Sequence, residues 1–185
     1  LLGDVLKSLL CTFALVGALA LGACGSDSGS ETKSPPPSSA TNPTTAPVMP
    51  ELARENSDAG AQAFVRHYID TLNYARSSGA LEPIEALSDP ECINCNVTFD
   101  TMRGVFGRGG KYEGGAWHVR SVKTERETWF TLVTVDTLLK AEIVYPSSES
   151  TPRTEPLENL EIEFQVSFTD EKWITHAFST NLEAA

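Results

Sequence analysis

The chain has 185 residues, of which 41% are hydrophobic and 21% charged, and its formal net charge at pH 7 is −11. This acidity disfavours nucleic acid and anionic lipid headgroups as partners, so no nucleic-acid role is expected. The sequence has no internal repeat, and its length leaves room for one domain of ordinary size after the N-terminal segments.

Residues 8–23 read SLLCTFALVGALALGA, an apolar run that ends at Cys24 and is followed at once by the polar segment GSDSGS. The run predicts the hydrophobic region of a signal peptide, and a permanent membrane span, which needs about 20 apolar residues, is the weaker interpretation. The residues LGAC at 21–24 resemble the bacterial lipobox, with an ordinary secretory signal as the alternative. The resemblance implies that residues 1–23, including Cys11, are removed and that Cys24 carries a diacylglycerol.

The lipobox resemblance also implies a location. A single acyl chain gives only marginal membrane binding, so the several fatty acyl chains of a lipoprotein, palmitate among them, are needed for stable attachment. The mature protein is therefore expected to be lipid-anchored on the outer, extracytoplasmic face of the cell membrane. The charges of Asp4 and Lys7 cancel each other, so removal of residues 1–23 leaves the net charge at −11.

Residues 25–50 are rich in Ser, Thr, Pro and Gly and contain almost nothing that can be buried. Such a segment cannot offset the entropy that ordering it would cost. As a flexible chain it spans on the order of 25 to 30 Å. We therefore divide the sequence into a signal peptide (1–23), a lipidated cysteine with a disordered linker (24–50) and a single domain (51–185).

The domain is predicted to begin with helices. The clearest helix covers residues 57–78, with Asn56 or Ser57 as the N-cap and Gly79 as the C-terminal stop. A short second helix is expected around residues 81–88. The first helix has one apolar stripe, formed by Ala61, Phe64, Val65, Tyr68, Leu72 and Ala75.

A third helix is expected from about Asn96 to a point before Gly109 and Gly110. The following segment GRGGKYEGG lacks the strand-to-helix context of a phosphate-binding loop, so its glycines are interpreted as turn residues. The predicted apolar stripe of this helix consists of Val97, Phe99, Met102, Val105 and Phe106.

After the third helix the apolar period changes from helical to alternating. Strands are predicted at residues 116–124, 128–145, 160–169 and 173–180, the last two joined by the turn TDEK. The second strand is longer than usual, so a bend or bulge is expected near Asp136 and Thr137. The segment PSSESTPRTEP is predicted to be an exposed loop. Helices followed by an antiparallel meander define the α+β class.

These segments carry a resemblance. The order of elements and the segments NYARSSGALEPIEALSDPECINC and EGGAW resemble an actinobacterial lipoprotein family of unknown function, over roughly residues 50–178. In fold, FVRHYIDTLNYARSSG followed by a sheet is similar to the nuclear transport factor 2 and ketosteroid isomerase superfamily. That similarity implies a curved, cone-like sheet of about four strands around the helices, with an apolar pocket. Because the superfamily holds enzymes and binding modules alike, the fold alone does not select a function. Its isomerases use an aspartate base and a buried acid or tyrosine, but no alignment with those positions is established for Tyr68, Tyr112, Asp100 or Asp136, so no catalytic role is carried over.

Cys92 and Cys95 are the two cysteines left once Cys24 is acylated. Outside the cytoplasm disulfides persist, so a structural disulfide between them is expected. A redox pair and half of a metal site are the alternatives. A thioredoxin-like pair would start a helix directly after a central strand, whereas this pair is predicted to lie between helices. A zinc site would need two further ligands, and the three histidines are scattered without ligand spacing.

Other chemical candidates have simpler explanations. His118 and His176 lie on predicted strands and are interpreted as hydrogen-bonded strand residues, with a general base at a pocket as the alternative for His118. Glu161 and Glu163 share one strand face, which paired acid and base groups would do, but a solvated face explains them. Three tryptophans are expected in the core: Trp117, Trp129 and Trp173.

No catalytic residue, metal ligand or cofactor is therefore assigned. The sequence favours an envelope lipoprotein that binds either a small apolar ligand or another envelope protein. The alternative is an isomerase or dehydratase that uses a pocket between helices and sheet, and a third possibility is a filled module that docks a partner through a strand face or edge. The charged face bearing Glu161 and Glu163 argues for a monomer.

Overall fold

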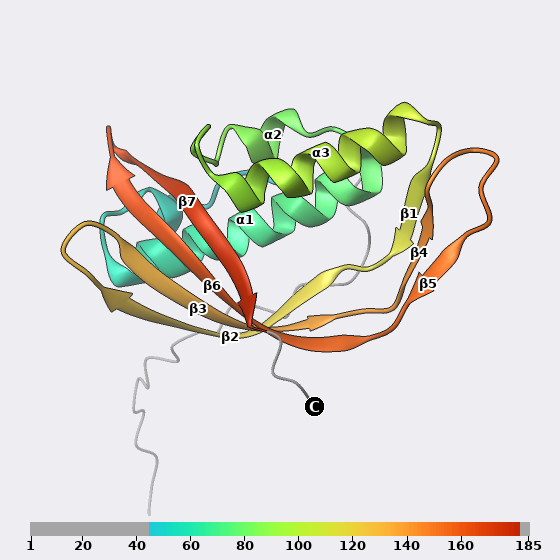
Figure 1. Ribbon diagram of the computed structural model, residues 1–185. Helices are drawn as coiled ribbons and strands as arrows, with labels where there is room; N and C mark the ends of the chain where they lie inside the picture. Colours follow the sequence, from blue (N-terminus) through green and yellow to red (C-terminus); the bar gives the residue numbers. More distant parts are fainter. Residues whose placement is uncertain (1–44, 182–185) are drawn as a thin grey trace, which may run out of the picture. The chain divides into compact units, whose positions relative to one another are not determined.

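The computed structural model describes residues 45–181, in which helices precede strands, as the α+β class requires (Figure 1). The expected fold class is therefore confirmed. No helix in this part of the chain is long and apolar enough to cross a membrane. The helices are the 3₁₀ turn η1 (Glu51–Arg54), α1 (Asp58–Ser78), α2 (Glu82–Glu85) and α3 (Ile93–Gly107).

Helix α1 has the predicted ends. The Ser57 side chain accepts a hydrogen bond from the backbone N–H of Gly60 at 3.0 Å, which satisfies one of the free N–H groups of the first turn. At the other end Gly79 adopts a left-handed conformation with φ of 80°, which a residue without a Cβ adopts at little cost. All six residues of the predicted apolar stripe are buried.

Helix α3 begins three residues earlier than predicted, because Cys92 is its N-cap and the Cys92 sulfur accepts a hydrogen bond from the Cys95 N–H at 3.3 Å. The earlier start brings Cys95 onto the buried face of the helix. Val97, predicted to be buried, is 61% exposed. It follows Cys95 by two residues, which places it about 200° away around the helix. The buried face consists of Cys95, Phe99, Met102 and Val105.

The strands form two antiparallel sheets, one with the order β1-β4-β5 and one with the order β2-β3-β6-β7. The larger sheet agrees with the expected four strands, and the smaller sheet was not predicted. The seven strands of the described chain are β1 (Lys111–Gly114), β2 (Trp117–Arg126), β3 (Thr131–Leu139), β4 (Glu142–Tyr145), β5 (Arg153–Glu155), β6 (Glu158–Thr169) and β7 (Lys172–Asn181).

The two sheets are joined by three short breaks. Strand β1 leads into β2, β3 into β4 and β5 into β6, each time after a gap of two residues: 115–116, 140–141 and 156–157. The strands turn at these gaps, so the strand layer bends along one line (Figure 1). At the first gap Gly114 and Gly115 both have positive φ, which a side chain would make costly.

The predicted strand 128–145 is therefore two strands, broken at residues 140–141 rather than bent near Asp136 and Thr137. A register shift does occur opposite Asp136 and Thr137, but the extra residue lies on the partner strand β2. It is Arg120, between Val119 and Ser121. The predicted loop 146–156 also contains the three-residue strand β5. Pairing with β4 supplies the hydrogen bonds that such a short polar segment lacks by itself.

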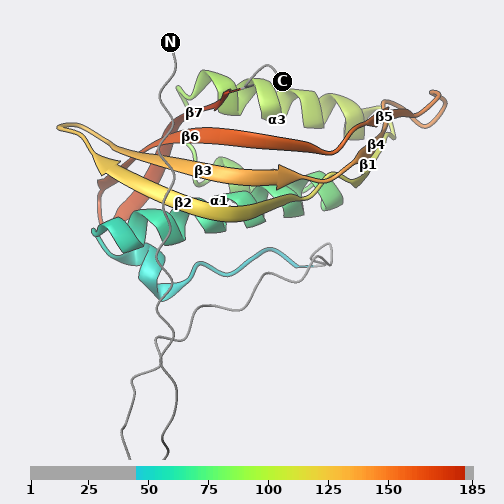
Figure 2. The same cartoon turned by 90° about the horizontal axis from the view of Figure 1, so that it is seen from below.

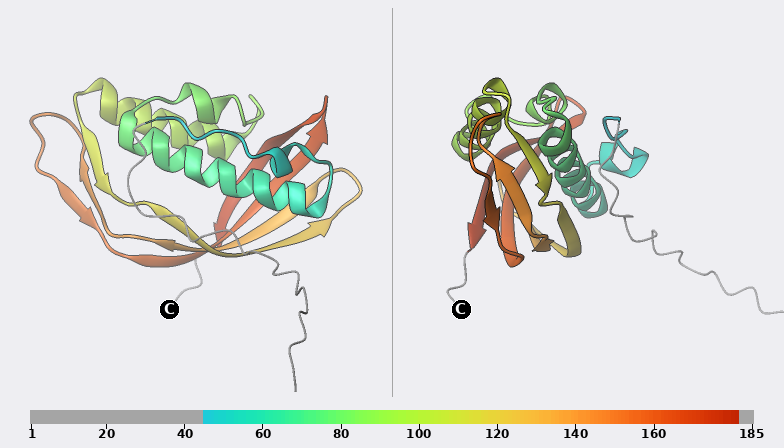
Figure 3. Two further views of the ribbon diagram at one scale, coloured as in Figure 1. Left: turned by 180° about the vertical axis from the view of Figure 1, so that it is seen from behind. Right: turned by 90° about the vertical axis from the view of Figure 1, so that its right-hand side faces the viewer.

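Helices α1 and α3 lie on the inner side of the bent strands (Figures 1 and 3). The opposite face of β2, β3 and β6 carries no helix of the described chain (Figure 2). The predicted alternation of β6 is confirmed, because Leu160, Ile162, Phe164 and Val166 are buried against the helices. The hairpin between β6 and β7 turns at Asp170 and Glu171, whose positive φ values are those of a tight two-residue turn.

Aromatic side chains fill the space between α1 and the larger sheet. The ring of Tyr68 lies 5.6 Å from that of Phe164 and 6.4 Å from that of Phe178, measured between centroids. Phe64 lies 6.4 Å from Tyr68 on the same helix. Phe64, Tyr68 and Phe164 are fully buried, so the position at which the superfamily resemblance implies an apolar pocket is occupied by the protein's own side chains.

Candidate functional site

The cysteine pair forms a disulfide in the structure, as the sequence predicts. Both cysteines are completely buried, and they lie in the first turn of α3, not before the helix as expected. No strand leads into this turn, because α2 and a short loop precede it. The pair thus has the helix position of a thioredoxin-like motif without its strand or its access to solvent, and it is part of the core.

Tyr68 connects the disulfide to the neighbouring loop. Its hydroxyl lies 2.9 Å from Ser88 Oγ and 3.5 Å from Cys95 Sγ. Burial raises the pKa of Tyr68 to about 12, so the phenol stays protonated at any physiological pH. The Tyr68 hydroxyl faces a serine and a sulfur rather than a buried carboxyl group, and this is not the pairing that isomerase chemistry needs.

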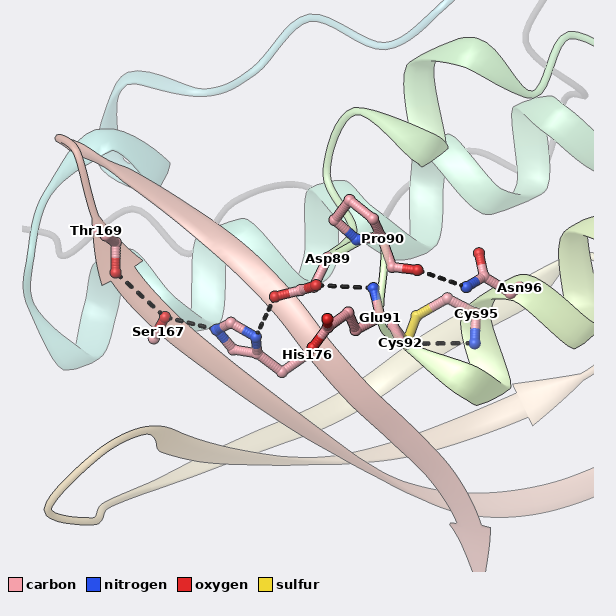
Figure 4. Close-up of polar contacts among 9 residues, drawn as sticks. All are labelled: Asp89, Pro90, Glu91, Cys92, Cys95, Asn96, Ser167, Thr169 and His176. Carbon is pink, nitrogen blue, oxygen red and sulfur yellow. Dashed lines mark hydrogen bonds and ion pairs between the residues drawn. A yellow bond between two sulfur atoms is a disulfide. The ribbon is translucent and has the colours of Figure 1, made fainter.

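A row of hydrogen bonds runs from the loop before α3 across β7 to β6 (Figure 4). Asp89 Oδ2 lies 2.8 Å from His176 Nδ1, and His176 Nε2 lies 2.7 Å from Ser167 Oγ. The prediction of His176 as a hydrogen-bonded strand residue agrees with this geometry. Neither Asp89 nor Ser167 could be connected with His176 from the sequence, because the three residues come together only through tertiary structure.

A bulge in β7 positions His176. Along the β6–β7 pairing, Gln165 is opposite Ala177 and Val166 is opposite Thr175, so His176 is an extra residue on β7. A bulge of this kind leaves one residue unpaired and re-aims its side chain. Asp89 is held on the far side of β7 by its own backbone N–H, which donates to the carbonyl of Thr175 at 2.8 Å.

A second candidate is an open groove of about 480 Å³ that lies between α3 and the end of β7 and is also lined by α1, β1 and β2. Val97 and Met102 line it from the helix, and Phe178 lines it from the strand. Asn94 bridges the two sides, because its Nδ2 donates to the carbonyl of Phe178 at 2.7 Å. The remaining lining residues are Arg76, Asn94, Thr98, Thr101, Tyr112, Trp117, Ser179 and Thr180.

The histidines stay apart in the structure. His67 is buried on α1, His118 lies on β2 and His176 on β7. Burial lowers the pKa of His67, and burial together with the nearby Lys140 charge lowers the pKa of His118. No group of three or more His, Cys, Asp or Glu side chains within residues 45–181 is close enough to hold a metal ion.

The acidic candidates do not converge on a pocket. Glu161 is exposed on the outer face of β6 and is paired in register with Asp136 of β3. Glu163, on the same face, is opposite Thr134. Asp100 is exposed on α3 and forms an ion pair with Arg103. These carboxyl groups form a charged outer surface rather than an acid–base pair.

The tryptophans divide into three environments. Trp173 is 3% exposed and belongs to the core as predicted, whereas Trp117 is partly buried and lines the groove. The prediction for Trp129 is wrong, because its side chain is 87% exposed. It lies in the turn between β2 and β3, beyond the last pair of the ladder, where no second layer covers it.

These features define a class of protein: an α+β domain with a filled interior and two surface hollows. Within that class, residues 36–179 match the family described as "Family of unknown function (DUF6318)", and the chain belongs to this family. The expectation of a family of unknown function is thus confirmed. No curated protein matches the chain significantly.

Several solved structures are similar in fold, and one of them covers most of this chain. It is the crystal structure of the intermembrane space region of the chloroplast protein ARC6, with a TM-score of 0.50 and 14% sequence identity. The match covers 68% of this chain and 97% of the other. Sequence identity this low shows shared architecture and nothing about activity.

Proposed function

We propose that this protein is a lipid-anchored docking module of the cell envelope that binds a segment of another protein in the groove between α3 and β7. The anchor rests on the lipobox resemblance at residues 21–24, which lies outside the described residues, and on the linker after it, of which only residues 45–50 are described. The docking role rests on the groove. We also retain the proposal that the fold is related to the nuclear transport factor 2 superfamily.

The single observation that supports docking is an open apolar groove beside a packed interior. Phe64, Tyr68 and Phe164 fill the space in which a small apolar ligand would be enclosed. The groove is open to solvent, and its lining mixes apolar side chains with hydroxyl, amide and guanidinium groups. Recognition of an extended segment uses both kinds of contact, since apolar pockets take alternate side chains and polar groups bond its backbone.

The exposed face of α3 continues the groove. Ile93 is 76% exposed and Val97 is 61% exposed, and they lie one turn apart on the same side of the helix. Large apolar side chains at adjacent exposed positions mark interaction surfaces when they border a hollow. Because the chain carries a net charge of −11, we expect the partner segment to be extended, apolar at alternate positions and basic at its flanks.

The other functions considered have less support. A small apolar ligand would need an enclosed pocket at the position that the aromatic core fills. An isomerase or dehydratase would need an acidic group facing the buried Tyr68, whose hydroxyl instead meets Ser88 and Cys95. We expect the domain to be a monomer. On its open sheet face Asp136 and Glu161 place like charges opposite each other, which disfavours packing of a second copy there.

A photo-crosslinking amino acid at Val97 tests the groove in the full chain in its native cells. We expect one discrete protein adduct from position 97. The matched control is the same amino acid at Leu157, which is 55% exposed and does not line the groove. A Thr101→Trp change, which fills the groove, should abolish the adduct from position 97. Equal adducts from both positions, or none from position 97, would reject docking at this groove.

The anchor is tested separately. Cys24→Ala should release the protein from the membrane fraction and abolish incorporation of radiolabelled palmitate, because the thiol is the expected attachment point. Cys11→Ala is the matched control and should leave both unchanged, since residue 11 lies in the segment expected to be removed. Palmitate labelling that survives Cys24→Ala would exclude the lipoprotein assignment and leave the groove hypothesis standing.

A further inference from the structure

Asp89, His176 and Ser167 have the spacing of a serine nucleophile with its base and orienting acid (Figure 4). The His176 ring bonds the carboxylate through Nδ1 at 2.8 Å and the serine hydroxyl through Nε2 at 2.7 Å. Such a constellation is recognised by geometry and by the role of each group, not by fold or by order in the chain.

Only one arrangement of protons fits this row when the imidazole is neutral. An ionised carboxylate accepts hydrogen bonds and cannot donate them, so Nδ1 of His176 must be the donor to Asp89. The other ring nitrogen then carries no proton and accepts the O–H of Ser167. The serine hydroxyl therefore points its proton at a base, which is the arrangement that activates it as a nucleophile.

Asp89 is fixed in its orienting position. Its Oδ1 accepts the backbone N–H of Glu91 at 2.8 Å, which leaves Oδ2 for His176. That N–H and, secondarily, the bond to His176 lower the pKa of Asp89, so the carboxylate is ionised at neutral pH. The loop is tied to β7 by two backbone bonds, Asp89 N–H to Thr175 O at 2.8 Å and Thr175 N–H to Leu87 O at 3.0 Å.

Ser167 opens onto an open hollow of about 260 Å³. The hollow lies between the β2–β3 turn, which carries Trp129, and the end of the β6–β7 hairpin. It shares no lining residue with the α3–β7 groove. The His176 side chain is 39% exposed, so water can reach the base.

The strand also offers a donor for a negatively charged intermediate. The last β3–β6 pair is Thr131 with Val166, so Phe168 lies beyond the ladder. The backbone N–H and C=O of Thr175 bond to the loop at Leu87 and Asp89, away from β6, so those of its partner Val166 point toward β3. Backbone groups alternate in direction along a strand, so those of Phe168, two residues later, point to the same side as those of Val166. The N–H of Phe168 therefore faces the β3 side and the hollow. It belongs to the residue directly after the nucleophile, a usual source of an oxyanion-binding N–H.

We propose that Ser167 is a nucleophile for small esters, with His176 as its general base and Asp89 as the positioning residue. Ser167 Oγ bonds to the acyl carbon while its proton passes to His176 Nε2. The ester C–O bond then breaks, and the alcohol leaves with that proton. Water next attacks the acyl carbon and gives a proton to His176 Nε2. His176 passes this proton to Ser167 Oγ as the acyl C–Oγ bond breaks, which releases the carboxylic acid and restores the free serine.

The test uses the full chain with two probes, a biotinylated fluorophosphonate and p-nitrophenyl acetate. The fluorophosphonate should form a Ser167 Oγ–P bond with loss of fluoride, located by mass spectrometry of the labelled peptide. Ser167→Ala should abolish labelling and reduce ester hydrolysis to the rate of the control without protein. The matched variant Ser121→Ala, on the outer face of β2, should keep the wild-type labelling rate.

Asp89→Asn tests the positioning role. It keeps a side chain of the same shape but allows the wrong ring tautomer, so we expect labelling to slow more than tenfold. Asp89→Glu, which keeps a carboxylate at this position, should label faster than Asp89→Asn, because the carboxylate and not the side-chain shape selects the ring tautomer. Wild-type labelling no faster than that of Ser167→Ala, or equal labelling rates in Asp89→Asn and the wild type, would overturn the proposal. Neither result bears on docking, since the groove residues are untouched.

Discussion

The guanidinium of Arg76, on α1, donates to both carboxylate oxygens of Glu142, on β4, with 3.2 Å between Nε and Oε1. Both side chains are largely buried, at 18% and 6% exposed. The guanidinium also lies 4.7 Å from the centre of the Tyr112 ring. This ion pair ties the long helix to the smaller sheet, beyond the line at which the strands bend.

Replacing Glu142 with Gln should destabilise the domain by about 3 kcal/mol, because it leaves a buried guanidinium without its counter-charge. Glu155 is the matched control, since it is paired in register with Glu142 on β5 and its own ion pair with Arg153 is exposed. Glu155→Gln should cost less than about 1 kcal/mol. Urea unfolding of both variants measures the difference, and equal midpoints would contradict the role given to the Arg76 pair.

Substitutions at Gly110 and Gly107 separate two effects on stability, that of close packing and that of backbone freedom. A Cβ at Gly110 would lie 2.1 Å from the carbonyl oxygen of Tyr145, whereas a Cβ at Gly107 would meet nothing within 4 Å. Gly110→Ala should therefore destabilise the domain by about 1 to 3 kcal/mol. Gly107→Ala, at the end of α3, should stabilise it by about 0.5 to 1 kcal/mol. Thermal denaturation distinguishes these opposite signs.

The disulfide should be closed and inaccessible. Iodoacetamide added to the native chain should modify neither Cys92 nor Cys95, because both are completely buried and bonded to each other. The double change to Ala should lower stability by about 2 kcal/mol, the entropy of closing so short a loop, plus a cavity contribution. Rapid labelling of the native protein without reductant would contradict the structural role.

Trp173 and Trp129 should differ in what their replacement costs in stability and in how readily their fluorescence is quenched. Trp173 packs against Phe64 and Phe168, and its indole N–H donates to Glu55 O at 3.0 Å. Trp173→Ala should cost about 3 to 5 kcal/mol. Trp129→Ala, at a side chain 87% exposed, should change stability by less than about 0.5 kcal/mol. Acrylamide should quench the fluorescence of Trp129 and leave that of Trp173 largely unaffected.

Stability should fall as the solution becomes mildly acidic. Burial lowers the pKa of His67 below its ordinary value of 6.5, so protons bind more readily to the unfolded chain. The loss should begin near pH 6.5 and continue down to the lowered folded value. Thermal midpoints at pH 7.5, 6.0 and 5.0 measure it, above the range in which ordinary carboxyl groups titrate.

A variant identifies the group responsible for this loss. His67→Gln should flatten the pH dependence, because the buried titrating ring is gone. The pKa of His118 is lowered as well, but this residue is less deeply buried. His118→Gln should therefore remove a smaller part of the stability loss at acidic pH. If His67→Gln keeps the full loss between pH 7.5 and 5.0, burial of His67 is not its cause.

The sequence alone determined the elements whose signal is local. The apolar stripe of α1, its caps at Ser57 and Gly79 and the alternation of β6 follow from periodicity and from the conformations that single residues favour. The disulfide followed from the number of cysteines and their expected compartment. For the helix and the strand the information lies within one continuous segment, whereas the disulfide prediction also needed the N-terminal segment that indicates the compartment.

Only the tertiary structure decided the start of α3, the exposure of Trp129 and the line along which the strands bend. The same holds for the row Asp89–His176–Ser167, whose outer members come from a loop and from the strand on the other side of β7. A residue's burial and hydrogen-bond partners depend on which distant segment packs against it. That choice is made by the strand register, here including the one-residue bulge at His176, and no local pattern encodes it.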